Sequence, residues 1–404
     1  MGSTWRRLAI LCLACTAVFV IAACGGSSDD NESASSTQSS SGAPEVGVDD
    51  LTADFSAMTK LKDLASEGKG MIGVLLPDTT TSARYVQYDA PNLKKAFETA
   101  GLSSDQFKID NAHGSTSTMQ QQAEADITAG ASVLLIDPLD PGSGAAIESK
   151  AVSQGVKVID YDRLVTGGPK DRYYVSFNNV EVGRLIGEGE VECIDAWKVS
   201  KPNVLVMSGA ATDNNAKLFA QGYNGVLNPH FSDGSYTKVG APAGTWDAPT
   251  AATTFEQQLT AHPNMNAVLM PNDDTANAVI AVLLKNKIAA NKFPVTGQDA
   301  SPSGLQNILL GYQCGTVYKP YFAEAQAAAA LAVYLRAGKT PPSSLVNDTT
   351  RDTTLNADIK SVYTKPFWVT KENMADTVVK DGTITASALC TPKVAKECKE
   401  AGIQ

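Results

Sequence analysis

The feature that most constrains the fold of this chain is a regular alternation of short apolar runs with segments of helical periodicity. The apolar runs are predicted to form buried strands over 71–76, 133–136, 156–159, 204–207 and 267–270. The periodic segments are predicted to form helices over 94–100, 119–129, 145–154, 182–197, 216–227, 253–261 and 276–287. Apolar strands flanked by amphipathic helices indicate parallel sheets covered on both faces. The predicted fold class is therefore α/β.

The N-terminus has the pattern of an export signal. Two arginines precede an apolar run over 8–23, which is shorter than the ~20 residues that span a bilayer core. Small residues stand directly before Cys24, a pattern that resembles a bacterial lipobox. By this resemblance 1–23 is a lipoprotein signal peptide and Cys24 carries the lipid; an ordinary signal-peptidase site is the alternative. The polar composition that follows predicts an unstructured tether over 24–66.

The predicted mature chain keeps four cysteines: Cys193, Cys314, Cys390 and Cys398. An exported protein can form disulfides, and four cysteines allow three pairings. A bridge between Cys390 and Cys398 is favoured, because it would fasten a C-terminal segment that otherwise frays. For Cys193 and Cys314, a second bridge and two buried free thiols are equally compatible with the sequence.

Charge and histidine content exclude several classes of partner. Lys and Arg number 33 against 43 Asp and Glu, giving a net charge of −10 without a basic run. Nucleic acid is therefore not a predicted partner. The three histidines, at 113, 230 and 262, have no metal-site spacing with the cysteines, so neither a metal nor a cofactor is predicted.

Polar residues follow most of the predicted strands. Asp160–Arg163 follows the strand over 156–159, Asp213–Asn215 follows 204–207, and Asn272–Asp274 follows 267–270. Ligands of open α/β sheets bind at the carboxyl ends of the strands, so two facing lobes would line a cleft with these groups. Asn both donates and accepts hydrogen bonds, whereas Asp accepts, a mixture suited to hydroxyl groups. Helix caps are the structural alternative.

Five motifs in order carry a resemblance to a known family. They are Val158–Arg163, Asp213–Phe219, Asn272–Asp273, Gly297–Ala300 and Thr316–Pro320. The segment from Met71 to Thr385 resembles the D-xylose-binding proteins of bacterial ABC importers. This implies the type I periplasmic-binding-protein fold, with two Rossmann-like lobes and three crossovers. The boundaries expected are 67–175 and 300–345 for the N-terminal lobe, 176–299 and 346–388 for the C-terminal lobe, and 389–404 for a tail.

The resemblance also implies a set of ligand-binding residues. Those expected to contact a sugar are Arg84, Tyr85, Arg163, Asn214, Trp246, Asn272, Asp299 and Lys319. Those expected to support them are Asp162, Asp213, Asn215, Lys217 and Gln298. Asn214 is the residue of its motif expected to touch the ligand, whereas Lys217 is expected to face the lobe surface. Tyr85 stands where the enterobacterial type has Trp, which keeps an aromatic platform but shortens it.

The function implied is a solute-binding lipoprotein, held on the outer face of the bacterial cytoplasmic membrane. It would capture one monosaccharide, with D-xylose favoured, and deliver it as a monomer to an ABC permease without turnover. The alternatives are another aldose such as glucose, or an exported sugar-active enzyme with a carboxylate pair. A sugar-responsive repressor is disfavoured, because such proteins carry a helix-turn-helix ahead of the sugar domain.

Overall fold

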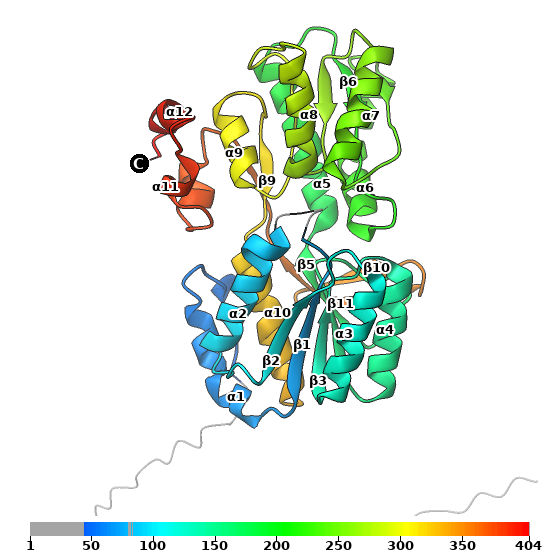
Figure 1. Ribbon diagram of the computed structural model, residues 1–404, viewed down its shortest axis with the longest axis vertical. Helices are drawn as coiled ribbons and strands as arrows, with labels where there is room; N and C mark the ends of the chain where they lie inside the picture. The colour runs from blue at the N-terminus through cyan, green and yellow to red at the C-terminus, as the bar shows by residue number, and fades with distance from the viewer. Residues whose placement is uncertain (1–43, 80–81, 83, 404) are drawn as a thin grey trace, which may run out of the picture. The chain divides into compact units, whose positions relative to one another are not determined.

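The N-terminal lobe is built on one seven-stranded sheet (Figure 1). The computed structural model describes residues 44–79, 82 and 84–403. The strands of this lobe are β1 (Met71–Leu76), β2 (Phe107–Asn111), β3 (Ala131–Ile136), β4 (Lys157–Tyr161), β5 (Tyr173–Phe177), β10 (Asp348–Asp352) and β11 (Ala357–Thr364). Their order in the sheet is β10-β11-β5-β4-β3-β1-β2. Every neighbouring pair is parallel except the antiparallel β10 and β11 pair.

Helices cover both faces of this sheet because successive side chains of a strand point to opposite faces. Ile72 and Val74 of β1 face one cluster, and Leu75 faces the other. The first cluster contains α1 (Lys62–Glu67), α2 (Ala90–Thr99) and α10 (Tyr321–Arg336). The second contains α3 (Thr116–Thr128) and α4 (Pro141–Ser153). The α/β class predicted from the alternating pattern is therefore confirmed.

The predicted tether over 24–66 is wrong in its second half. The chain forms η1 (Val48–Asp50), η2 (Ser56–Leu61) and α1, and side chains of this segment are buried in the first core cluster: Val46, Leu51, Phe55, Met58, Leu61 and Leu64. Burial of several large apolar side chains offsets the entropy of ordering such a segment. The signal peptide over 1–23, Cys24 and the rest of the tether lie outside the described residues.

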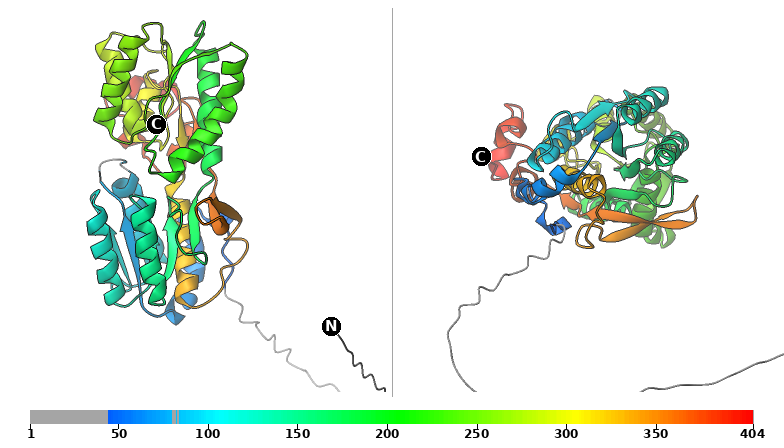
Figure 2. Two further views of the ribbon diagram at one scale, coloured as in Figure 1. Left: turned by 90° about the vertical axis from the view of Figure 1, so that its right-hand side faces the viewer. Right: turned by 90° about the horizontal axis from the view of Figure 1, so that it is seen from below.

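The C-terminal lobe has a smaller parallel sheet, in the order β7-β6-β8. The strands of this sheet are β6 (Asn203–Val206), β7 (Thr237–Gly240) and β8 (Ala267–Leu269). The lobe also contains a separate antiparallel pair of strands, β9 (Thr316–Tyr318) and β12 (Phe367–Val369). Its helices are α5 (Asn179–Ala196), α6 (Asn214–Ser232), α7 (Ala248–Ala261), α8 (Asp273–Lys285) and α9 (Pro302–Leu309). Helices α5 and α6 lie side by side (Figure 2). Their backbones approach closely at Gly183, where a Cβ would lie 2.1 Å from the carbonyl oxygen of Phe219.

The chain passes between the lobes three times, and the residues at which it does so differ from the predicted lobe boundaries. The chain leaves the first lobe after β5, returns between β9 and α10, and leaves again between β11 and β12. Residues 302–318 therefore belong to the C-terminal lobe, and 348–364 to the sheet of the N-terminal lobe. The assignments of 300–345 and 346–388 are wrong in these parts, because the pairing of β10 and β11 with β5 is set by contacts distant in sequence.

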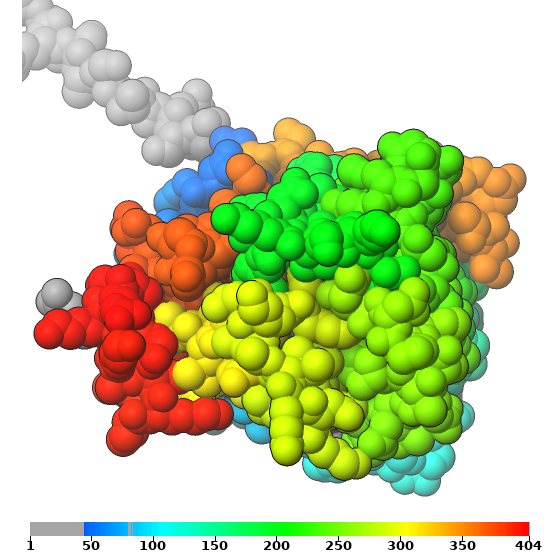
Figure 3. Space-filling view, turned by 90° about the horizontal axis from the view of Figure 1, so that it is seen from above, coloured from blue at the N-terminus to red at the C-terminus, as the bar shows by residue number. Residues whose placement is uncertain are grey.

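Two disulfides lie in the C-terminal lobe. Cys390 is joined to Cys398, as the sequence favours, and Cys193 of α5 is joined to Cys314, which precedes β9. The final residues form η4 (Ala375–Val379), α11 (Ala386–Leu389) and α12 (Ala395–Glu400). The red C-terminal segment lies against the yellow segment around α9 in Figure 3, consistent with the shared cluster of Leu389 and Leu305.

Glu190 of α5 is a carboxyl group buried without a partner. Neither of its oxygens has a hydrogen bond within the described residues, and its burial raises its pKa to about 8 from the ordinary 4.5. Between these values the folded protein holds a proton that the unfolded chain has released. The free energy of unfolding contributed by this group is therefore greatest at low pH and falls as the pH rises toward 8.

Replacing Glu190 with glutamine is expected to remove this pH dependence, because an amide of similar shape does not ionise. The stability gained over the wild type should grow by roughly 1.4 kcal/mol for each pH unit between pH 5 and pH 7. Urea unfolding at three pH values measures it. Glu192→Gln, at an exposed position of the same helix, is the matched control, and a Glu190→Gln curve parallel to that of the wild type would contradict the account.

Candidate functional site

A small polar cavity collects residues from both lobes. It is lined by Ser82, Arg84, Tyr85, Asp162, Arg163, Asp213, Asn215, Phe219, Trp246, Asn272, Gln298, Asp299 and Lys319. Most of these residues follow the carboxyl end of a strand: Asp162 follows β4, Asp213 follows β6, Asn272 follows β8, and Lys319 follows β9. The structure thus brings together residues that lie far apart in the sequence.

On the N-terminal lobe, Arg84 is held by three carboxylates. Its Nε lies 2.8 Å from Asp89 Oδ2, its Nη1 2.9 Å from Asp162 Oδ1, and its Nη2 2.6 Å from Glu324 Oε2. The guanidinium also lies over the ring of Tyr321, 4.5 Å from the centroid. One guanidinium cannot balance three buried carboxylates, and burial raises the pKa of the Glu324 carboxyl. These hydrogen bonds therefore hold Arg84 and its three carboxylates rigidly, and Glu324 retains its proton more readily than an exposed glutamate does.

Arg163 connects the two sides of the cavity. Its Nη2 donates to the hydroxyl of Tyr85 at 2.9 Å, and its Nε lies 3.4 Å from Asp213 Oδ2 and 3.6 Å from Asp137 Oδ1. Asp213 also accepts a hydrogen bond from Trp246 Nε1 at 3.1 Å. Burial raises the pKa of Asp137, whose oxygens have no hydrogen bond within the described residues.

The backbone is strained at two cavity residues. Asp162 has φ 58° and Asp299 has φ 96°, values that residues other than glycine seldom adopt. The carbonyl of Asp162 accepts hydrogen bonds from Tyr174 Oη, Ser176 Oγ and Asn215 Nδ2, at 2.8, 2.8 and 2.9 Å. Strain of this kind persists where the surroundings fix the conformation, and it concentrates at ligand sites.

The C-terminal lobe contributes polar atoms that are still available for hydrogen bonding. Asn272 caps α8 by accepting from the backbone N–H of Thr275 at 3.1 Å, and its amide nitrogen donates to no other described residue. Gln298 Oε1 is buried and unpaired in the described part of the chain. Lys319 Nζ lies 2.9 Å from Asp299 Oδ1. A ligand with hydroxyl groups would supply both donors and acceptors to this wall.

Two of the expected residues lie away from the cavity. Asn214, expected to touch the ligand, is the half-exposed first residue of α6, and Lys217 is exposed on the same helix. Asn215 lines the cavity instead, and its amide reaches Asp162 on the other lobe. The reason is helix phase, because each residue turns the side chain by about 100°. Asn215 and Phe219 therefore face inward together.

Four residues of the site escaped the sequence prediction. Ser82 and Phe219 line the cavity, while Asp89 and Glu324 hold Arg84. Phe219 could have been found from its i, i+4 spacing to Asn215. Glu324 is the one acidic residue of the alanine-rich helix α10, which is an unfavourable place for a charge without a partner.

The described part of the chain has no group of His, Cys, Asp and Glu side chains arranged for a metal ion. In the same residues, no helix is long and apolar enough to cross a membrane.

A model of the periplasmic binding protein domain matches residues 72–340. The chain belongs to the periplasmic binding protein family. This membership agrees with the two α/β lobes and with a cavity between strand ends contributed by both of them.

Several relatives of the family are similar to this chain. A D-xylose-binding periplasmic protein of Escherichia coli is 36% identical over 279 residues, covering 68% of this chain and 80% of the relative. A multiple sugar-binding periplasmic receptor of Rhizobium radiobacter is 30% identical, covering 80% and 92%. A carbohydrate transporter solute-binding protein of Chloroflexus aurantiacus, solved with D-glucose, has a TM-score of 0.70 at 28% identity, covering 78% of this chain and 97% of its own.

Proposed function

We propose that this protein is the sugar-binding component of an ABC importer and that D-xylose is its favoured ligand. The observation that carries the proposal is the cavity, where polar atoms of both lobes converge beside the aromatic side chains of Trp246 and Phe219. Hydroxyl groups of a sugar pair with such atoms, and an aromatic ring packs on the apolar face of the pyranose. The similarity to D-xylose-binding periplasmic proteins supports the choice of pentose.

The mechanism is capture without chemical conversion. A sugar between the lobes contacts Arg84 and Arg163 on one side and Asn272, Asp299 and Lys319 on the other. Because both sets of contacts form together only when the lobes are closed, ligand binding favours the closed state. The closed form is then the species delivered to the permease. The named relatives are binding proteins, which supports a role without turnover.

Export with a lipid anchor at Cys24 completes the proposal. The described body begins at residue 44, so 20 residues from Cys24 to Ala43 would join it to the membrane. Replacing Cys24 with alanine should release the protein from the membrane fraction, with Ser27→Ala in the same segment as a control. A Cys24→Ala protein that stays in the membrane fraction would rule out this anchor.

Calorimetric titration with pentoses and hexoses tests the ligand. We expect the tightest binding for D-xylose, with D-glucose as the nearest competitor because the Chloroflexus aurantiacus relative was solved with that sugar. Tighter binding of glucose would correct the choice of sugar. Binding of no monosaccharide would refute the function, and products formed from an oligosaccharide would identify an enzyme instead.

Two adjacent asparagines provide a matched test of the site. Asn215→Ala removes hydrogen bonds to Asp162 and is expected to weaken sugar binding by about 1–3 kcal/mol. Asn214→Ala makes the same chemical change outside the cavity lining, and its affinity should stay within about twofold of the wild type, or 0.4 kcal/mol. Calorimetry of both variants decides the assignment, which fails if Asn214→Ala shows the larger loss.

A further inference from the structure

One buried carboxylate links three segments of the C-terminal lobe. Asp273, the first residue of α8, is 1% exposed. Its Oδ1 accepts hydrogen bonds from Gln313 Nε2 at 2.7 Å and from Thr316 Oγ1 at 2.9 Å. Its Oδ2 accepts from the backbone N–H of Ser301 at 2.7 Å. Asp273 itself lies outside the cavity lining.

Each of these segments carries a cavity residue. Asn272 directly precedes Asp273, Asp299 stands two residues before Ser301, and Lys319 stands three residues after Thr316. The backbone N–H of Asp273 also donates to the carbonyl of Gln298, another cavity residue, at 2.9 Å. The carboxylate of Asp273 therefore lies at the point where the segments that carry Asn272, Asp299 and Lys319 meet.

The three partners require an acceptor at this position. All three donate, and Thr316 Oγ1 also accepts from the backbone N–H of Ala300 at 3.2 Å, so the proton of this hydroxyl is directed to Asp273. An amide would place N–H groups against at least one of these donors. The packing is tight as well: a Cβ on Gly297 or Gly304 would lie 2.1 or 2.3 Å from a carboxylate oxygen of Asp273.

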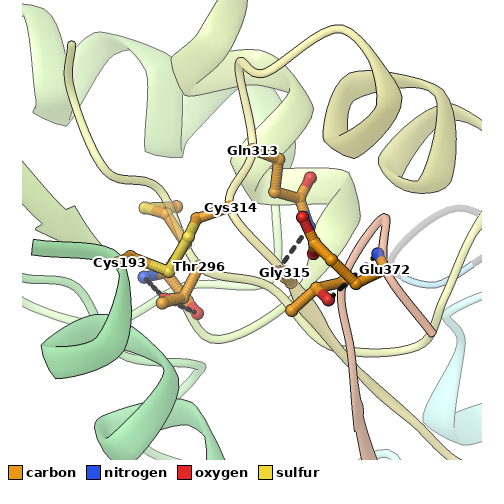
Figure 4. The surroundings of a disulfide bond; sticks show 8 residues. Cys193, Thr296, Gln313, Cys314, Gly315 and Glu372 are labelled. Atoms are coloured by element: carbon orange, nitrogen blue, oxygen red, sulfur yellow. Dashed lines mark hydrogen bonds between the residues drawn. A yellow bond between two sulfur atoms is a disulfide. The ribbon is translucent and has the colours of Figure 1, made fainter. Parts of the chain in front are cut away.

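The disulfide fixes the third segment from the opposite side. Cys314 follows Gln313 and is bonded to Cys193 of α5 (Figure 4). Gln313 Nε2 also donates to the carbonyl of Gly315 at 3.2 Å, the contact drawn as a dashed line beside the bridge. The start of β9 is thus held by a covalent bond and by the carboxylate of Asp273.

We propose that Asp273 is a positioning residue for sugar binding, which holds Asn272, Asp299 and Lys319 in place because its hydrogen bonds join its own segment to the two segments that carry Asp299 and Lys319. This inference rests on the proposed function. Asp273 touches no ligand, and its role is to set the geometry of side chains that do.

The first test is the affinity of Asp273→Asn for D-xylose, or for the tightest sugar of the panel. We expect a loss of about tenfold, the effect of one lost hydrogen bond. Asp195→Asn removes one charge from an exposed position of α5 in the same lobe, and its affinity should stay within about twofold, or 0.4 kcal/mol. Thr316→Val, which removes one donor with little change in shape, should lose about threefold, or 0.7 kcal/mol.

A pH profile separates positioning from a general loss of stability. Burial raises the pKa of Asp273 to about 7, and a proton taken up below this value turns one acceptor into a donor. The ratio of wild-type to Asp273→Asn affinity should therefore shrink toward one between pH 8 and pH 6. The ionisable groups around Asp273 include Asp299 and Tyr88, and both remain in the variant. A ratio that does not change with pH would overturn the positioning role.

Hydrogen exchange tests the same role without a sugar. In Asp273→Asn, exchange of the Ser301 and Ala300 amides should accelerate about tenfold, because the first donates to Asp273 and the second to its partner Thr316. Amides of β3 in the other lobe should be unchanged. Unchanged exchange at 300–301 would overturn the inference, whereas a wild type that binds no sugar would overturn the proposed function alone.

Discussion

Replacing Arg84 with methionine is expected to lower the free energy of unfolding by about 3–5 kcal/mol and to abolish sugar binding. The side chain is 3% exposed and is surrounded by Asp89, Asp162 and Glu324. Methionine has a similar length but no charge, so it would leave these carboxylates buried beside one another. The pKa of Asp162 is lowered because the charges of Arg84, Lys319 and Arg163 outweigh its burial, so the loss should be smaller at low pH, where Asp162 is protonated. Urea unfolding and calorimetric titration measure the two effects.

The matched control is Arg184→Met in α5. Arg184 also pairs with two carboxylates, those of Glu181 and Glu188, but its side chain is 43% exposed. Exposed pairs contribute about 0–1 kcal/mol, so this variant should keep both its stability and its affinity. Equal losses of stability and affinity at the two positions would show that burial does not increase the contribution of the Arg84 ion pairs. Arg84→Lys, which keeps the charge without the planar fork, should recover more stability than affinity.

The second large effect is expected from the disulfide between Cys193 and Cys314. Its cysteines are 121 residues apart, whereas Cys390 and Cys398 are 8 residues apart. On the chain-entropy relation, opening the long loop by double alanine substitution should cost about 4–5 kcal/mol, and opening the short loop about 2–3 kcal/mol. Denaturant unfolding of both double variants measures the difference. The reverse order would show that strain or residual structure, rather than loop length, governs these bridges.

The fold class was predictable because a strand that is buried on both faces is apolar along its length, and this pattern is visible in a few consecutive residues. The strand over 133–136 is apolar without interruption, as expected when helices cover both faces of a parallel sheet. By contrast, β10 has the sequence Asp-Thr-Thr-Arg-Asp, which carries no strand pattern. Its place beside β11 depends on pairing with distant residues, so the lobe boundary near 346 could not be read locally.

The site was predictable to the level of motifs rather than of single residues. Asn214 and Asn215 have the same side chain, and only the phase of α6 decides which one faces the cavity. A shift of one residue in the helix start would exchange their roles. Of the carboxylates that hold Arg84, the two that the prediction missed are Asp89, from a neighbouring turn, and Glu324 of α10, 240 residues away, so no spacing rule connects them.

The ion pair between Arg163 and Asp213 has a consequence for the motion of the lobes. The two residues belong to different lobes, and Arg163 Nε lies 3.4 Å from Asp213 Oδ2. Separation of the lobes breaks this pair, so the pair adds to the stability of the closed arrangement before any contact with a ligand is counted.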